Sequence, residues 1–159
     1  MLYAPKELHS SIDKKKGYVP IMYKNANSGI IYYSSYGNTE KYGLDIYKVS
    51  VSDNGMLGKP VRLSEKINTQ YDERFPFLTE DKSTFYFSST GHNSMGGADI
   101  FQASFDTTTN TFGQPRNLDY SVNTPDDDFM YAEVGKEGIA YFASNRNCEK
   151  GKAYVYKIN

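Results

Sequence analysis

The chain repeats itself about every 55 residues, and this period restricts the possible fold more than any other feature. Aromatic or aliphatic residues followed by a small pair such as Ser-Ser occur at 31–35, 85–89 and 140–144. Asp45-Ile46-Tyr47 returns as Asp99-Ile100-Phe101, and Ile67-Asn68-Thr69 returns as Val122-Asn123-Thr124. Repeats of this length built from short strands are typical of solenoids and propellers.

The composition fits strands and excludes several kinds of partner and site. Tyr (15) and Phe (9) are abundant, and aromatic residues favour strands. The net charge is −1, so nothing indicates a nucleic-acid or anionic-membrane partner. Cys148, the single cysteine, cannot form an intramolecular disulfide or a cysteine-based zinc site. No stretch reaches the roughly 18 apolar residues of a membrane span, so we expect no membrane insertion. No signal peptide is visible, so we expect either a cytosolic chain or one whose leader has been removed.

Each repeat predicts four short antiparallel strands separated by turns rich in Asn, Asp, Ser and Gly. We therefore expect an all-β fold made of β-propeller blades. No window shows helical periodicity. The expected strands are 18–23, 30–34, 44–51 and 60–63 in the first unit, 74–78, 84–88, 98–105 and 115–118 in the second, and 129–133, 139–143 and 153–158 in the third.

The third unit ends after its third strand, and a match for the missing strand stands at the other end of the chain. Pro5-Lys6-Glu7-Leu8 resembles Pro60-Val61-Arg62-Leu63. We therefore expect residues 5–8 to be a strand that completes a last blade. The chain is then a single propeller domain or half-propeller of three circularly permuted four-stranded blades. Its units are 1–63, 64–118 and 119–159.

Three blades are too few for a closed ring, because propellers typically have 4–8. Two arrangements remain open at this point. Two copies could associate head to tail into a six-bladed ring, which predicts self-association. Alternatively, the chain could be one stretch of a longer propeller.

The second unit carries a recognisable set of motifs: Tyr71-Asp72-Glu73-Arg74-Phe75-Pro76-Phe77, Thr84-Phe85-Tyr86-Phe87-Ser88-Ser89 and Gly96-Gly97-Ala98-Asp99-Ile100-Phe101. These resemble the WD40-like, TolB-type propeller repeat (PD40), in particular the form beside OmpA-like domains in envelope proteins of Bacteroidetes. The resemblance implies a periplasmic or outer-membrane-associated module that binds protein partners without catalysis. Because TolB-type blades also occur in serine peptidases, the alternative is an accessory propeller of a hydrolase, either a peptidase or a carbohydrate-active enzyme.

One end of the blades gathers the candidate binding residues, because an up-and-down blade places the loops before its first strand beside those after its second. This expected binding face consists of Asp72, Glu73, Asp126, Asp127, Asp128, Ser35, Ser89, His92 and Asn93. Its carboxylates could hold calcium through oxygen ligands. They could instead brace the loops by accepting backbone hydrogen bonds. Repetition in register favours bracing, so we expect no resident metal or other cofactor.

The sequence contains no constellation that indicates catalysis. There is no Gly-x-Ser-x-Gly turn. His9 and His92 have no repeated carboxylate partner, and Lys14-Lys15-Lys16 reads as a solvated loop. We therefore assign no catalytic residue and expect a binding protein.

Overall fold

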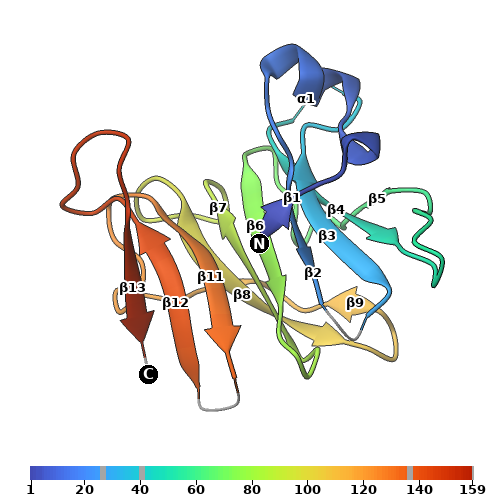
Figure 1. The fold of residues 1–159 in the computed structure, drawn as a ribbon. Helices are drawn as coiled ribbons and strands as arrows, with labels where there is room; N and C mark the ends of the chain where they lie inside the picture. The colour runs from blue at the N-terminus through green and yellow to red at the C-terminus, as the bar shows by residue number, and fades with distance from the viewer. Residues whose placement is uncertain (26–27, 40–41, 136–137, 159) are drawn as a thin grey trace.

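A computed structural model describes residues 1–25, 28–39, 42–135 and 138–158. It contains three antiparallel sheets that follow one another across the molecule (Figure 1). The first sheet has the order β1 (Leu2–Tyr3), β2 (Ile21–Lys24), β3 (Ile30–Ser35), β4 (Asp45–Ser50) and β5 (Val61–Arg62). The second has β6 (Glu73–Leu78), β7 (Thr84–Ser89), β8 (Asp99–Asp106) and β10 (Arg116–Asn117), with β9 (Thr111–Phe112) also paired to β8. The third has β11 (Asp128–Val134), β12 (Ile139–Ser144) and β13 (Tyr154–Ile158).

The all-β class predicted from the sequence is confirmed. In each sheet, strands that follow one another in the repeat pair antiparallel, as the alternation of strands and turns predicts. The β-strand β6 lies between β2 of the first sheet and β11 of the third. The repeat in sequence is therefore a repeat of whole sheets.

The N-terminal prediction is wrong in one respect, because residues 5–8 do not form a strand. Lys6–Leu8 is a 3₁₀ helix, and Ser11–Lys16 is a short α-helix, α1. The helix α1 is six residues long, too short to show a periodic pattern, but Ser10 and Asp13 form a capping box at its start. The lysines expected in a loop occupy the last turn of this helix. Positively charged side chains stabilise the C-terminal end of a helix.

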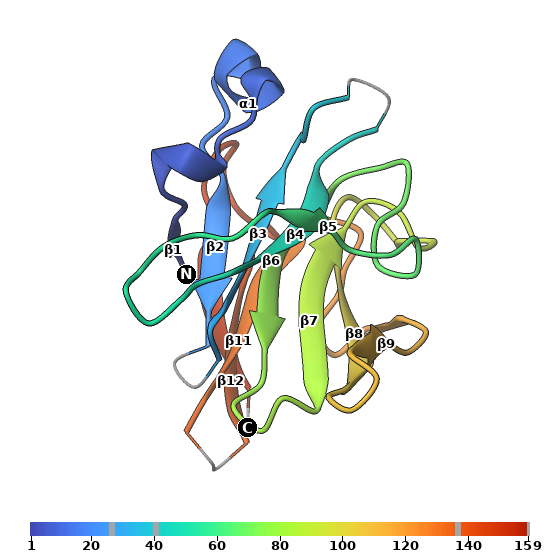
Figure 2. The ribbon, with the colours of Figure 1, turned by 90° about the vertical axis from the view of Figure 1, so that its right-hand side faces the viewer.

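The N-terminal segment covers the outer face of the first sheet. Ala4 and Leu8 are buried against Ile31, Tyr33 and Val49. The segment can be followed beside β2 in Figure 2, with β1 pairing through Tyr3 and Ile21. The first sheet is therefore buried on both faces within one chain.

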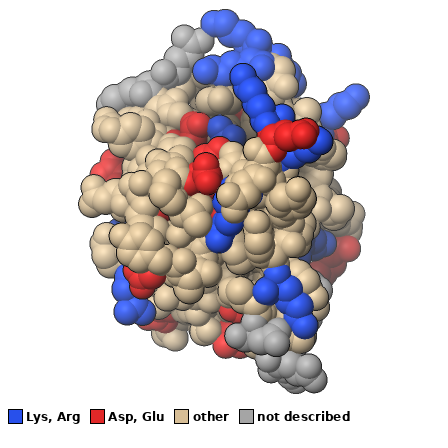
Figure 3. All heavy atoms as spheres, turned by 90° about the vertical axis from the view of Figure 1, so that its left-hand side faces the viewer, with Lys and Arg blue, Asp and Glu red and all other residues tan. Residues whose placement is uncertain are grey.

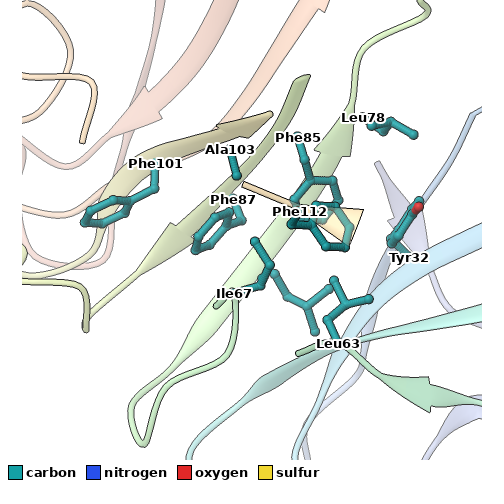
Figure 4. Close-up of a cluster of buried hydrophobic side chains, with 10 residues drawn as sticks. Tyr32, Leu63, Ile67, Leu78, Phe85, Phe87, Phe101, Ala103 and Phe112 are labelled. Carbon is teal, nitrogen blue, oxygen red and sulfur yellow. The ribbon is translucent and has the colours of Figure 1, made fainter. Parts of the chain in front are cut away.

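Two apolar cores join the sheets. Side chains that point alternately to the two faces of β7 contribute to both cores. Phe85 and Phe87 belong to the core shared with the first sheet, where the Phe85 ring lies 5.1 Å from that of Tyr32 between centroids (Figure 4). Tyr86, between them, belongs to the core shared with the third sheet, where its ring stacks on Tyr131 at 4.2 Å between centroids. Such alternation is expected of a strand buried on both faces.

The third sheet is open to solvent on its far side. Tyr141 corresponds to Tyr86 in the repeat, yet it is 37% exposed, whereas Tyr86 is 7% exposed. The strands of this sheet also expose Met130, Val134, Tyr154 and Val155. Figure 3 shows this side of the molecule, on which charged side chains are few and scattered. The molecule thus has one covered end and one open end.

Candidate binding cleft

A cleft of about 480 Å³ lies between the second and third sheets, at the end of the strands where the acidic loops meet. The second sheet contributes Arg74, Phe75, Ser88 and Thr90 to its walls. The third unit contributes Asp127, Phe129, Asn145 and Lys152. The cleft combines two aromatic rings with cationic and hydrogen-bonding groups, as pockets that bind specific ligands do.

Repeated β-bulges shape this cleft. The pairing of β6 with β7 shifts between Arg74 and Phe77, and that of β11 with β12 shifts between Phe129 and Ala132. Phe75 and Met130, at corresponding positions, have φ of 52° and 62°, which is rare for residues other than glycine. A bulge bends a strand and redirects its side chains. Phe75 stacks on Phe129 at 5.5 Å between ring centroids, and the two form an apolar wall.

The first acid of each acidic pair connects neighbouring units. Asp72 Oδ1 accepts a hydrogen bond from the Leu44 N–H at 2.7 Å, and Asp127 Oδ1 accepts one from the Ala98 N–H at 2.8 Å. Both N–H groups belong to the preceding unit. Gly97 is required here, because a Cβ at this position would collide with the Asp127 carboxylate. The acids therefore fix how one unit sits on the next.

The second acid of each pair braces its own unit from the interior. Glu73 is fully buried and accepts hydrogen bonds from the Thr69 N–H at 2.8 Å, the Thr69 hydroxyl at 2.7 Å and the Ser89 hydroxyl at 2.7 Å. Asp128, also fully buried, accepts from the Thr124 N–H at 2.6 Å and pairs with Arg146 at 2.5 Å. These contacts hold the loop before the first strand of the unit against the end of its second strand.

Burial raises the pKa of Glu73 to about 7, although the hydrogen bonds from Ser89 and Thr69 act in the opposite direction. Desolvation disfavours the charged carboxylate, and hydrogen bonds to it favour that form. Burial is the larger effect here. The Glu73 carboxyl therefore changes charge near neutral pH while it is bonded to Thr69 and Ser89.

The first unit has no acidic pair, but Asp13 performs the same task from α1. It accepts a hydrogen bond from the Ser35 hydroxyl at 2.5 Å and another from the Tyr36 N–H at 2.8 Å. Ser10 takes the part of Thr69 and Thr124 in the other units, since its backbone N–H donates to the Asp13 carboxylate at 2.8 Å. Sequence reasoning missed this brace. Its signal was the Ser-x-x-Asp spacing, which differs by one residue from Thr-x-x-x-Glu.

Two buried asparagines form a further repeated contact that the sequence marked without revealing its role. Asn68 accepts from the Ile46 N–H at 2.7 Å and donates to the Ile46 carbonyl at 3.0 Å. Asn123 makes the same two contacts with Ile100, each at 2.8 Å. Each side-chain amide thus mimics a neighbouring strand at one residue.

The nine residues expected on one binding face do not form one site. Asp72 and Asp127 line the cleft, but their oxygens accept hydrogen bonds within the protein. The His92 Nε2 lies 2.8 Å from the Ile67 carbonyl, and its ring packs on Phe87 and Phe101. The remaining members divide by burial: Glu73, Asp128, Ser35 and Ser89 are buried, whereas Asp126 and Asn93 are exposed.

Sequence reasoning did not select the groups that give the cleft its polarity. Arg74 donates to Asp72 at 2.7 Å through Nη2, while its buried Nε and the buried Ser88 hydroxyl have no protein partner. Arg74 pairs with Ser88 across β6 and β7, and the corresponding pair in the third unit is Phe129 with Ala143. Arg74 is therefore specific to the second unit, whereas Ser88 recurs as Ser34, whose hydroxyl is bonded to the Tyr18 hydroxyl. The signal of Arg74 in the sequence was a departure from the repeat.

Within the described ranges, no group of three or more His, Cys, Asp or Glu side chains is placed to hold a metal ion. Among the same residues, no helix has the length and apolar character needed to cross a membrane. No protein-family model matches the chain, and no curated protein matches it either.

Proposed function

We propose that this chain is a non-catalytic binding module, built from three blades of the β-propeller type, and that its cleft binds a protein partner. One observation supports this most directly. The repeated acids at this end bond to the protein's own backbone, whereas Arg74 does not repeat, and its Nε lies unpaired in the cleft wall beside the unpaired Ser88 hydroxyl. Residues that repeat serve the repeated backbone, so the departures from the repeat are the candidates for function.

The chemistry of the cleft defines the ligand feature that it would accept. The guanidinium of Arg74 and the Thr90 and Ser88 hydroxyls offer hydrogens to an acceptor, and Phe75 with Phe129 offers an aromatic surface. Arginine and aromatic residues are enriched where proteins concentrate binding energy. A side chain or terminus that joins a carboxylate to an apolar group would match this arrangement.

The resemblance of the repeat to TolB-type blades supports an envelope location, periplasmic or associated with the outer membrane. It also supports a role in protein contacts rather than turnover. His92 is held by the Ile67 carbonyl and by two aromatic rings, and among the described residues it has no hydrogen bond to a serine, threonine or cysteine side chain. We expect the purified chain to hydrolyse no peptide, ester or glycoside substrate. Turnover that His92→Ala abolishes would overturn the proposal.

Site-specific photo-crosslinking tests the binding surface. A photoreactive amino acid replaces Thr90 or Lys152 at the cleft, or exposed Lys59 or Thr108 as matched controls away from it. In an envelope fraction of cells that express the protein, we expect one discrete adduct from the cleft positions and none from the controls. The identified partner, once purified, should bind Arg74→Ala at least tenfold more weakly than the wild type. Equal adducts from all four positions would overturn the proposal.

A further inference from the structure

We propose that the protein partner inserts a tyrosine side chain into the cleft, where the tyrosine hydroxyl binds to Ser88 and Arg74. The inference rests on the proposed function, because it names the residue that the partner places there. Ser88 is 1% exposed, and among the described residues neither its hydroxyl nor the buried Arg74 Nε has a hydrogen-bond partner. A buried polar group without a partner lowers stability, so its presence in a native fold calls for an explanation.

The first unit shows which group satisfies a serine at this place in the repeat. Ser34 pairs with Ile46 of β4 as Ser88 pairs with Ile100 of β8, so the two serines are equivalent. The Tyr18 hydroxyl lies 2.8 Å from the Ser34 hydroxyl and forms a hydrogen bond with it. A tyrosine hydroxyl is therefore the partner that the chain itself supplies to the first of these serines.

The two serines face equivalent spaces between neighbouring sheets. Each lies two residues after a tyrosine, and side chains two residues apart on a strand share a face. These tyrosines are Tyr32, which packs on Phe85 of the second sheet, and Tyr86, which packs on Tyr131 of the third. The Tyr18 hydroxyl thus lies between the first and second sheets, at the place that corresponds to the cleft between the second and third.

A tyrosine matches the groups in the cleft better than phenylalanine or serine does. Its hydroxyl oxygen can accept the Arg74 Nε–H while its hydrogen is donated to the Ser88 Oγ. The two protein groups are directly opposed across β6 and β7, so they share one face of the sheet. Phe75 and Phe129, with ring centroids 5.5 Å apart, offer an aromatic surface to the ring. Phenylalanine would leave the buried polar atoms unpaired, and serine would leave the aromatic surface uncovered.

Arg74 controls how a ligand reaches the buried Ser88 hydroxyl. Both residues line the cleft, and the Arg74 side chain is 40% exposed. Its ion pair with Asp72, at 2.7 Å, is partly exposed, and ion pairs of this kind contribute little to stability. The guanidinium can therefore shift to admit the tyrosine ring at a small cost in free energy.

Two synthetic peptides test the inference on the full chain. One is acetyl-Gly-Gly-Tyr and the other is acetyl-Gly-Gly-Phe. Both end in a free carboxylate, the feature already assigned to the ligand, so they differ in one hydroxyl. Amide chemical shifts in nuclear magnetic resonance spectra locate the bound peptide and give its dissociation constant. We expect shifts at Thr90 and Gly151 in the cleft, and binding of the tyrosine peptide about tenfold tighter than that of the phenylalanine peptide.

Two serine variants connect this preference to one hydroxyl of the protein. Ser88→Ala should bind both peptides equally. It should also fold, because the third unit has Ala143 at the same position and the lost hydroxyl has no partner among the described residues. The matched control is Ser34→Ala, which should keep the preference for the tyrosine peptide. This control should melt at a lower temperature than the wild type, because Tyr18 loses its partner.

The outcomes separate this inference from the proposed function. Equal binding of both peptides to the wild type, no binding at millimolar peptide, or a tyrosine preference that Ser88→Ala keeps would overturn the inference. Cleft adducts with a partner would still support the proposed function in each of these cases. Free tyrosine that binds as tightly as the peptide would also overturn the inference, since the site would then take a small molecule. If Ser88→Ala does not fold, the comparison of the two peptides on the wild type decides. A tyrosine preference without any cleft adduct would overturn the proposed partner alone.

Discussion

Asp72 and Asp127 each use both carboxylate oxygens inside the protein. The Asp127 oxygens accept from the Ala98 N–H and the Asn145 side chain, at 2.8 and 3.0 Å. The Asp72 oxygens accept from the Leu44 N–H and from Arg74, both at 2.7 Å. A carboxylate with these partners acts as a structural connector between units. This role also explains why a glycine precedes each of the two backbone donors.

We predict that Asp127→Ala lowers the free energy of unfolding by about 1–3 kcal/mol, because the Ala98 N–H is left without an acceptor. The neighbouring Asp126 is exposed, so Asp126→Ala is the matched control and should change stability by about 0.5 kcal/mol or less. Urea denaturation measures both values. Calcium and chelators should not shift the melting temperature. A calcium-dependent rise that Asp127→Ala removes would instead indicate a metal site.

Glu73 should make stability depend on pH in a defined direction. Its pKa is raised from 4.5 to about 7 by burial, so between these values the folded protein holds a proton that the unfolded chain has released. The resulting stabilisation is fully present below about pH 4.5 and is lost as the pH rises through about 7. Since Glu73→Gln cannot titrate, the stability advantage of the wild type over this variant should shrink by up to about 3 kcal/mol from pH 4.5 to 8. An advantage that stays constant over this range would contradict the assignment.

At the scale of strands, the repeat in the sequence was sufficient to place most elements. The second strands of the units were predicted within one residue of β3, β7 and β12, because apolar residues and flanking turns mark them clearly. The N-terminal 3₁₀ helix and α1 were missed. There, the match of Pro5 and Leu8 to Pro60 and Leu63 is real in sequence, but tertiary packing on Ile31 and Tyr33 decides the conformation.

The candidate site was less predictable than the strands, for a physical reason. The sequence shows which residues repeat, and repetition was enough to identify the acidic braces. It does not show that a bulge at Phe75 brings that ring onto Phe129, because the positive φ arises from the pairing of β6 with β7. The position of Arg74 in the cleft depends on the same pairing. These relations between strands are absent from any single segment.

The contact between the Asn123 side chain and the Ile100 backbone gives a testable prediction. We expect Asn123→Ala to lower the free energy of unfolding by about 3 kcal/mol, because the N–H and carbonyl of Ile100 lose their shared partner inside the protein. Hydrogen exchange gives a residue-specific measure. The Ile100 amide should exchange at least tenfold faster in the variant, while that of Ile46, held by Asn68, should keep its rate. Equal acceleration at both amides would indicate general loosening instead.

At the scale of the whole molecule, the N-terminal segment distinguishes two views of assembly. If residues 5–8 closed a partner's blade, removing residues 1–10 would convert a dimer into a stable monomer. In the structure, the same deletion uncovers Ile31, Tyr33 and Val49 and removes the Ser10 cap. We therefore expect the truncated chain to unfold at a lower temperature and to expose apolar surface to a fluorescent dye such as ANS. Light scattering after size exclusion, compared with the 18.0 kDa monomer mass, completes the test.

The difference between the two ends of the molecule limits how copies of it can accumulate. Identical molecules that can associate through both ends form an open filament, because each added copy exposes an end that can bind the next copy. Here the N-terminal segment covers Ile31, Tyr33 and Val49 of the first sheet, whereas the third sheet exposes Tyr141 and Val155. If the third sheets of two copies contact each other, both exposed faces are buried and a third copy cannot bind there. We therefore expect the covered first sheet to restrict the association of copies to pairs.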